Sequence, residues 1–329
     1  MTSDRGSRWR RWSRSGAGAQ DRRRFIPVLI LLGLSAFITL LNPTFLTPGN
    51  VITVVLQASI LSIVAIGQTY VILTAGIDLS VGSLVALGGA LAAGLAVRAG
   101  LGTYPAILLT LLVGVGLGAV SGFLVVKGNI PPFVATLAMM AIARGLTLVY
   151  TQGRPIAGLG ADFTFLGTGE VLGIPMPVWI MAVVALLATL LLTQTRFGLY
   201  VRAIGGGGEE TVRLAGVRPG VIKLSVYMLS GFTATLGGIL LAARLWSAQP
   251  NAGIGLELDA IAAAVLGGAS LFGGIGGVGG TLLGALLIGV LSNGMNLLEI
   301  PSYYQQVVKG MVFVLAVLLD FATRRRPSL

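Results

Sequence analysis

Long stretches without a single charged side chain constrain this chain more than any other feature of its sequence. Residues 28–41 and 176–192 contain no Asp, Glu, Lys or Arg, and over the whole chain 55% of residues are hydrophobic and 10% are charged. An average soluble domain has about 25% charged residues, so this composition excludes an ordinary soluble enzyme. Apolar runs of this length are typical of helices that cross a lipid bilayer. The sequence therefore predicts a membrane protein.

Apolar runs divided by proline, glycine and charged residues predict about ten membrane-spanning helices, because one span needs about 20 residues. The predicted fold class is an all-α, polytopic membrane helix bundle. The membrane domain covers residues 25–322, with basic tails at 1–24 and 323–329. The predicted helices are residues 25–42, 51–74, 79–97, 104–126, 132–151, 176–194, 223–246, 257–271, 280–298 and 303–321.

The positive charge of the chain lies mainly at its two ends. The formal net charge is +11, residues 1–24 contain eight arginines, and residues 324–326 are all arginine. Basic residues that flank membrane spans face the cytoplasm, so both termini are expected there. With an even number of spans, the loop at 195–223 then lies in the cytoplasm as well. We expect the lipid bilayer as a partner of these basic segments and no nucleic-acid binding.

Residue types that carry much of enzyme chemistry are missing from the sequence. It has no Cys and no His, which excludes disulfides, thiolate nucleophiles and Cys/His metal sites. Residues 274–279 fit the spacing G-x-G-x-x-G, but a dinucleotide site needs a preceding strand, and here the neighbours are membrane spans. No G-x-x-x-x-G-K-[ST] sequence is present to bind ATP phosphates. We therefore expect no catalytic residue, no metal and no cofactor, and we interpret residues 274–279 as a bend.

Glycine is the second organising signal, with 49 in the chain. Gly114, Gly118 and Gly122 recur at four-residue spacing, and so do Gly280 and Gly284. This spacing places them on one face of a helix, where two helix backbones can approach closely. We expect these glycines to hold the bundle together.

Two of the predicted helices look interrupted. Asp78 is followed by Ser80 and then by the small residues 88–90, and Asp259 precedes the small residues 267–269. This weak repeat suggests that helices two to five and seven to ten form halves of inverted topology, as in many transporters. An acid near the membrane is a functional candidate, because an unpaired charge there is costly. Each acid could instead cap the half-helix that follows it, which is the interpretation we prefer.

The loop at 195–223 contains four glycines at 205–208, followed by Glu209 and Glu210. Acidic residues favour the start of a helix, and a glycine such as Gly216 favours its end. The loop therefore predicts a flexible hinge and a short helix on the membrane surface. Such a helix could be a connector or could dock a cytosolic partner, and the residue pattern leaves both open.

Several motifs, in order, resemble the permease subunit of ribose-type ABC sugar importers. They are residues 71–83 (VILTAGIDLSVGS), residues 135–150 with their Arg-Gly pair, residues 213–216 (RLAG) and residues 247–268. The resemblance extends over about 30–322. It implies a second permease copy, with a homodimer expected, two cytosolic ABC ATPase subunits that hydrolyse the ATP, and an extracytoplasmic sugar-binding protein. It also implies the bacterial cytoplasmic (inner) membrane as the location.

The resemblance further implies that the loop helix is a coupling helix that docks into the ATPase. Its residues would be Glu209, Glu210, Arg213, Leu214 and Gly216. The family has Gly-Gly-Asn before its acidic residue, whereas this loop has four glycines and no Asn. Arg213 is therefore the residue that we expect to matter most for coupling.

The function implied is import of a monosaccharide, ribose or a similar sugar, by alternating access. Sugars are uncharged polyols, so their path needs neutral donors and acceptors. The alternative is a gradient-driven secondary transporter of a small polar solute, which would need an ion relay that a chain without His and with few acids does not offer. The candidate residues for the path or for the helix breaks are Asp78, Ser80, Gln57, Gln68, Gln249, Asn251, Asp259 and Asn293.

Overall fold

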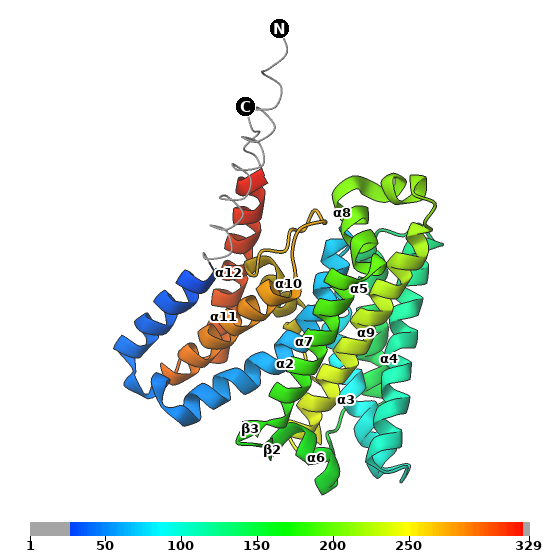
Figure 1. Ribbon diagram of the computed structural model, residues 1–329. Coiled ribbons are helices and arrows are strands. Elements are labelled where there is room, and N and C mark those ends of the chain that lie inside the picture. The colour runs from blue at the N-terminus through cyan, green and yellow to red at the C-terminus, as the bar shows by residue number, and fades with distance from the viewer. Residues whose placement is uncertain (1–26, 325–329) are drawn as a thin grey trace.

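The computed structural model describes residues 27–324, and these residues form a bundle of α-helices (Figure 1). Six helices in this part of the chain are long and apolar enough to cross a membrane. They are α2 (Pro48–Leu73), α4 (Thr103–Val126), α5 (Pro132–Thr151), α7 (Met176–Gln194), α9 (Pro219–Arg244) and α11 (Val278–Leu297). The all-α membrane fold expected from the sequence is thereby confirmed, with six spans by this criterion.

Helices that do not meet this criterion occupy the remaining apolar ranges. They are the helix Pro27–Leu41, α3 (Val81–Val97), α10 (Leu256–Leu266) and α12 (Ser302–Arg324). The predicted tail at 1–24 and most of that at 323–329 lie outside the described residues.

The connections contain small elements of their own. They are the 3-10 turn η1 (Pro43–Leu46), α6 (Ala161–Thr168), α8 (Arg196–Leu214) and four strands of two residues each. Strand β1 (Ile156–Ala157) pairs antiparallel with β4 (Ser247–Ala248), and β2 (Glu170–Val171) pairs with β3 (Ile174–Pro175).

Proline sets the start of four of the long helices. Helices α2, α5, α7 and α9 each have a proline in their first two positions, where the missing N–H costs nothing because it would have no partner within the helix. The chain leaves α5 through Gln152 in the left-handed conformation (φ 55°), which ends the helix. These local backbone preferences explain why the helix boundaries predicted from the sequence lie close to the observed ones.

Helices α2 and α9 form the centre of the bundle and pack against each other. The apolar window of α9 is 72% buried and that of α2 is 56% buried, against 22% for the peripheral α7. Around this pair, α4 and α3 pack on α9, while α11 and α10 pack on α2. Helix α5 packs on α3, and α12 packs on α10. In Figure 1, α8 lies at the same end as the C-terminal end of α12, and α6 with β2 and β3 lies at the opposite end.

Glycine permits the close approach of these helices, as predicted. A Cβ atom at Gly118 would overlap the carbonyl oxygen of Tyr227 on α9, and one at Gly284 would overlap the carbonyl oxygen of Ala263 on α10. Backbones can come this close only where no side chain intervenes. The apolar side chains of α4, α5 and α7 that point away from the bundle are exposed, as expected for surfaces that face lipid.

The residues 274–279 form a bend, as the sequence indicated. Gly274 and Gly276 have positive φ values of 76° and 139°. A Cβ at Gly274 would lie 2.7 Å from the Cα of Gly206, so the bend packs directly on α8. Within the described residues every strand is two residues long, and none precedes this bend as a dinucleotide site would need.

Replacing Gly118 by alanine tests the packing of α4 on α9. The added methyl group meets backbone, which cannot rotate away, so we expect a loss of about 1–3 kcal/mol of stability and a lower melting temperature in detergent. Gly116→Ala is the matched control, because nothing lies within 4 Å of a Cβ at that position of the same helix. Equal melting temperatures for the two variants would contradict this packing.

Candidate functional site

The chain leaves the helical conformation between α2 and α3, and Asp78 holds this break. Its side chain is buried, with 1% exposed. Its Oδ1 accepts hydrogen bonds from the backbone N of Ser80 (2.9 Å) and from the Oγ of Ser80 (2.6 Å), and its Oδ2 accepts one from the Oγ of Ser230 on α9 (2.7 Å). Three donors thus surround one buried carboxylate, which is how proteins stabilise such a group away from water.

Two further side chains satisfy the backbone of the break. With its amide oriented for hydrogen bonding, Gln68 of α2 donates to the carbonyl oxygen of Asp78 (3.0 Å) and accepts from its N–H (3.2 Å). Thr136 of α5 donates to the carbonyl oxygen of Ile77 (3.2 Å). Helices α2, α5 and α9 therefore all contribute polar groups to this one segment.

The structure brings together three of the residues chosen from the sequence, namely Gln68, Asp78 and Ser80. It adds Ser230 and Thr136, which sequence reasoning missed. Helix α3 begins at Val81, and its N-cap residue is Ser80. Asp78 accepts a hydrogen bond from the N–H of that N-cap residue. It therefore stabilises the non-helical residues before α3 and not the first turn of the helix.

The prediction that Asp259 caps a half-helix is wrong. Helix α10 begins at Leu256, so Asp259 lies inside it, and the N-cap residue is Gly255. The Oδ2 of Asp259 instead forms an ion pair with the Nζ of Lys309 on α12 (2.7 Å). Both side chains are largely buried, with 16% and 27% exposed. This pair joins α10 to α12.

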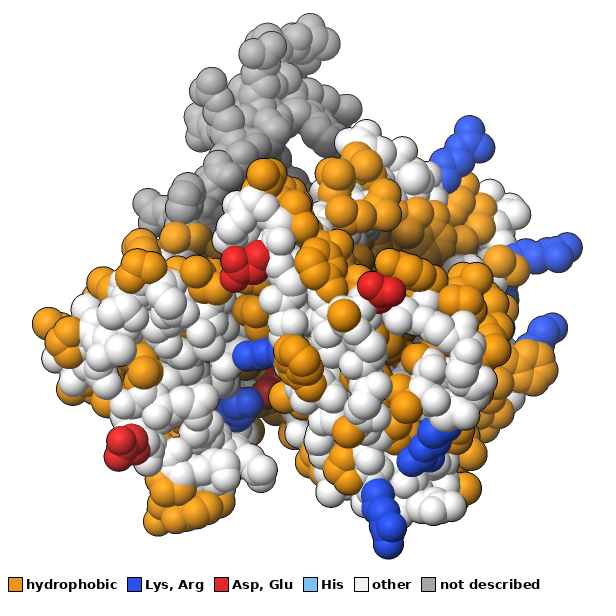
Figure 2. Space-filling view, turned by 90° about the horizontal axis from the view of Figure 1, so that it is seen from below, with side chains coloured by type: hydrophobic (Ala, Val, Ile, Leu, Met, Phe, Trp, Pro, Cys, Tyr) orange, Lys and Arg blue, Asp and Glu red, His pale blue; other side chains and the backbone are white. Residues whose placement is uncertain are grey.

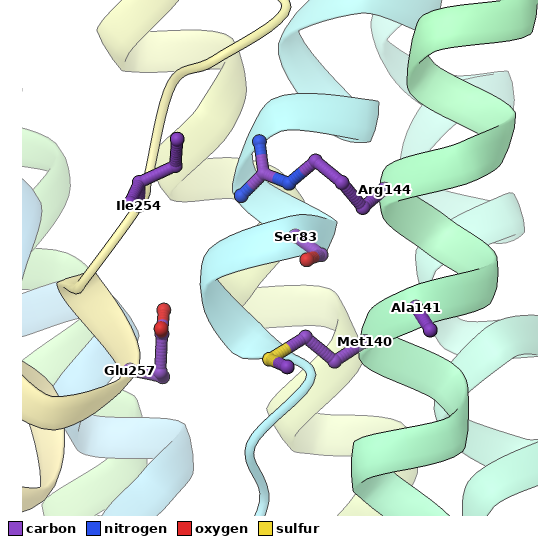
Figure 3. Close-up of a pocket in the computed structure, with 6 residues that line it drawn as sticks. All are labelled: Ser83, Met140, Ala141, Arg144, Ile254 and Glu257. Atoms are coloured by element: carbon purple, nitrogen blue, oxygen red, sulfur yellow. The ribbon is translucent and has the colours of Figure 1, made fainter.

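Arg144 of α5 fastens the segment that leads into α10. Its Nη1 donates to the carbonyl oxygens of Pro250 (3.0 Å) and Ala252 (2.9 Å). Beside it lies a cavity of about 240 Å³. Figure 3 shows this cavity between α3, α5 and the start of α10; its lining residues are Ser83, Met140, Ala141, Arg144, Ile254 and Glu257. The sequence signal for this site was a charged residue within an apolar helix.

The remaining polar candidates lie in other places. Gln249 donates to the Oγ of Ser247 (2.8 Å) and so lies in the same segment that Arg144 fastens. Asn251, also in this segment, is exposed. Asn293 of α11 exchanges two hydrogen bonds with Asn50 of α2 (2.8 and 3.0 Å), which makes it a contact between helices.

Gln57 is half-buried on α2, and no described hydrogen bond involves its side chain. The eight candidate residues therefore do not form one continuous site.

The loop expected at 195–223 contains α8, which is longer than predicted. Helical conformation continues through Gly205 to Gly207 and breaks only at Gly208 (φ 81°, ψ 166°), so the expected four-glycine hinge reduces to one residue. A Cβ at Gly205 would overlap the carbonyl oxygen of Leu73 at the end of α2. The glycine run therefore allows α8 to pack closely on the bundle.

Beyond the kink at Gly208, the predicted coupling residues lie on an exposed surface. Glu210 and Arg213 form an ion pair of 3.5 Å, with side chains 76% and 63% exposed. Leu214 is also exposed, and Gly216 follows with a φ of 76°. Glu209 differs, because it binds Lys223 of α9 at 2.8 Å and so ties this short helix to the bundle.

Comparison with known proteins identifies the family to which this chain belongs. Residues 50–317 match the family described as "Branched-chain amino acid transport system / permease component". The chain is 50% identical to the ribose import permease protein RbsC of Escherichia coli K12 over 308 residues, which cover 92% of this chain and 94% of that protein. It is 47% identical to RbsC of Haemophilus influenzae (91% and 93% covered) and 48% identical to RbsC of Bacillus subtilis (89% and 91% covered). No solved structure matches the chain.

Removing the carboxylate of Asp78 tests its role in the break. In Asp78→Ala the buried N–H of Ser80 and the hydroxyl of Ser230 lose their acceptor, and an unsatisfied buried group costs about 1–3 kcal/mol. We expect a lower melting temperature in detergent. Asp162→Ala removes an exposed acid from the first turn of α6 and serves as the control. Equal stability of the two variants would show that the carboxylate does not hold the break.

Proposed function

Since the chain belongs to the family of branched-chain amino acid transport system permease components, and within it to the ribose-type ABC permeases, we propose that it is the transmembrane subunit of an ATP-driven importer of ribose or a similar monosaccharide. The single observation that carries this proposal is the identity of 47–50% to ribose import permeases over about nine tenths of both chains. The protein is a transport component and not an enzyme. It lies in the bacterial inner membrane as a multi-pass protein.

Ten membrane segments are proposed for the whole subunit. Six are the long helices, and the other four are Pro27–Leu41, α3, α10 and α12. Helices α3 and α10 are short, and each follows a non-helical stretch, so we propose that helix and stretch cross the membrane together. An even number puts both termini on the same side, and the basic tails favour the cytoplasm for that side; α8 lies at the same end as the C-terminal end of α12 (Figure 1).

The pattern of helix contacts supports two inverted halves, α2–α5 and α9–α12. Exchange of α2 with α9, α3 with α10, α4 with α11 and α5 with α12 converts each major contact among these eight helices into another that is present. The contact of α4 with α9 becomes that of α11 with α2, and the contact of α3 with α5 becomes that of α10 with α12. Transporters with such repeats work by rocking one half against the other around a site near the midplane.

ATP hydrolysis is assigned to partner subunits, because the sequence has no P-loop. The short helix after Gly208 is the proposed docking element, since Glu210, Arg213 and Leu214 all project from it into solvent. The complete importer would contain two permease copies, two cytosolic ABC ATPase subunits and an extracytoplasmic sugar-binding protein. Closure of the ATPase pair would pull this helix and reorient the permease halves.

The polar residues chosen from the sequence divide into three groups. Gln68, Asp78 and Ser80 bind each other or the backbone of the break, so we assign them a positioning role. Asp259 and Asn293 serve contacts between helices. The remaining candidates for the sugar path are those without such a partner on another helix, Gln57, Gln249 and Asn251.

Reversing the charge of Arg213 tests the docking element. Arg213→Glu removes an exposed cation without disturbing the core, so we expect a folded protein that loses its ATPase partner on purification and shows at least about tenfold less ATP-dependent ribose uptake. Arg154→Glu, an exposed arginine in the segment between α5 and α6, is the matched control. Normal uptake by Arg213→Glu would refute this assignment.

Replacement of residues 209–216 by a Gly/Ser linker extends the test to the whole element. Residues 205–208 stay in place, because Gly205 packs on the end of α2. The natural chain should co-purify with a P-loop ATPase, and the linker variant should not. A chain that comes out alone and carries ribose into liposomes without ATP would instead support a gradient-driven transporter.

A further inference from the structure

The cavity beside Arg144 has the size of a small-molecule site. Its volume of about 240 Å³ leaves room for several waters or for one small polar molecule. Side chains from three parts of the fold line it: α3, α5 and the segment entering α10 (Figure 3). On the face of the bundle opposite α8, the surface is hollowed between two lobes, and basic and acidic side chains lie in the hollow (Figure 2).

Arg144 and Glu257 approach this cavity from different helices and do not pair with each other. Within the described residues, Glu257 has no ion pair and no hydrogen bond. Among the described residues, Arg144 donates hydrogen bonds through Nη1 alone, to the carbonyl oxygens of Pro250 and Ala252, which leaves Nε and Nη2 as further donors. Asp259, two residues further along the same helix, forms an ion pair with Lys309. Glu257 therefore differs from Asp259, because among the described residues no cation pairs with its carboxylate at the cavity.

The backbone of α3 makes room for Glu257. A Cβ atom at Gly82 would overlap the Oε2 of Glu257 and the carbonyl oxygen of Gly253, so a side chain at that position would displace the carboxylate. Ile254 and Met140 add apolar surface to the same walls. Fixed donors on one side, an acceptor on the other and apolar surface between them are typical of small-molecule sites.

We infer that Arg144 and Glu257 form a binding subsite for sugar hydroxyls on the translocation path of this subunit. The inference rests on the proposed function and assigns it a place in the structure. The guanidinium donates to hydroxyl oxygens, the carboxylate accepts from hydroxyl hydrogens, and the carbon skeleton of the sugar lies against Ile254 and Met140. The two charges sum to zero, so the subsite suits a neutral polyol and not an ion.

The first test uses the importer purified with its ATPase and binding protein and reconstituted in liposomes. Glu257→Gln keeps the side-chain size and breaks no described contact, so the complex should assemble and hydrolyse ATP as the wild type does. We expect D-ribose transported per ATP to fall about tenfold, the change produced by losing one hydrogen bond to a charged group. Glu299→Gln, which neutralises an exposed acid between α11 and α12, should leave this ratio unchanged.

The second test needs no change of charge. The sequence contains no Cys, so Ala141→Cys places a single thiol of this chain in the cavity wall, at an exposed position. D-ribose should slow its modification by a small water-soluble thiol reagent, measured as the mass of this chain, several-fold. Sucrose at equal osmolarity is the control for non-specific solute effects and should leave the labelling rate unchanged.

These experiments separate the subsite from the proposed function. An unchanged ratio of ribose to ATP in Glu257→Gln overturns the subsite, and so does labelling of Ala141→Cys that ribose does not slow. A wild-type complex that carries no ribose overturns the proposed function itself, whatever the variants do.

Discussion

A chain that leaves the helical conformation inside a membrane must find partners for its backbone N–H and C=O groups, because lipid offers none. The segment between α2 and α3 meets this requirement with side chains from three helices. Gln68 binds both backbone groups of Asp78, Thr136 binds the carbonyl of Ile77, and Ser230 binds the Asp78 carboxylate. The break is therefore fixed by the same contacts that join α2, α5 and α9.

Close packing of helix backbones makes these contacts possible. A hydroxyl group is short, so Ser230 reaches Asp78 only because α2 and α9 lie against each other. A Cβ at Gly67 of α2 would lie 2.9 Å from the Cα of Ser230. In a bilayer, apolar side chains gain little by leaving lipid tails for a neighbouring helix, because both surroundings are apolar. Small residues and polar contacts must therefore hold the helices together. The glycines and the buried polar cluster are two parts of one packing arrangement.

The sequence allowed the helices, the membrane setting and part of the polar cluster to be predicted, because apolar runs and isolated acids are local signals. It did not reveal Ser230 or Thr136, which look like any hydroxyl residue in an apolar helix until a distant partner is known. The capping role of Asp259 was wrong for the same reason: α10 begins earlier than its acids suggest, and Lys309 lies far along the chain. The glycine run at 205–208 was expected to be flexible, whereas the nearness of α2 makes most of it helical.

Two cations on corresponding helices of the proposed halves, Lys309 and Arg144, have different partners. On α12, Lys309 forms an ion pair with Asp259, and this pair joins α12 to α10. On α5, Arg144 donates hydrogen bonds to two backbone carbonyl oxygens of the segment before α10 and forms no ion pair with an acidic residue among those described. Among the described residues, Glu257 forms no ion pair. One cation therefore serves only to hold the helix, whereas the other holds the backbone and also leaves a donor and an acceptor facing one cavity.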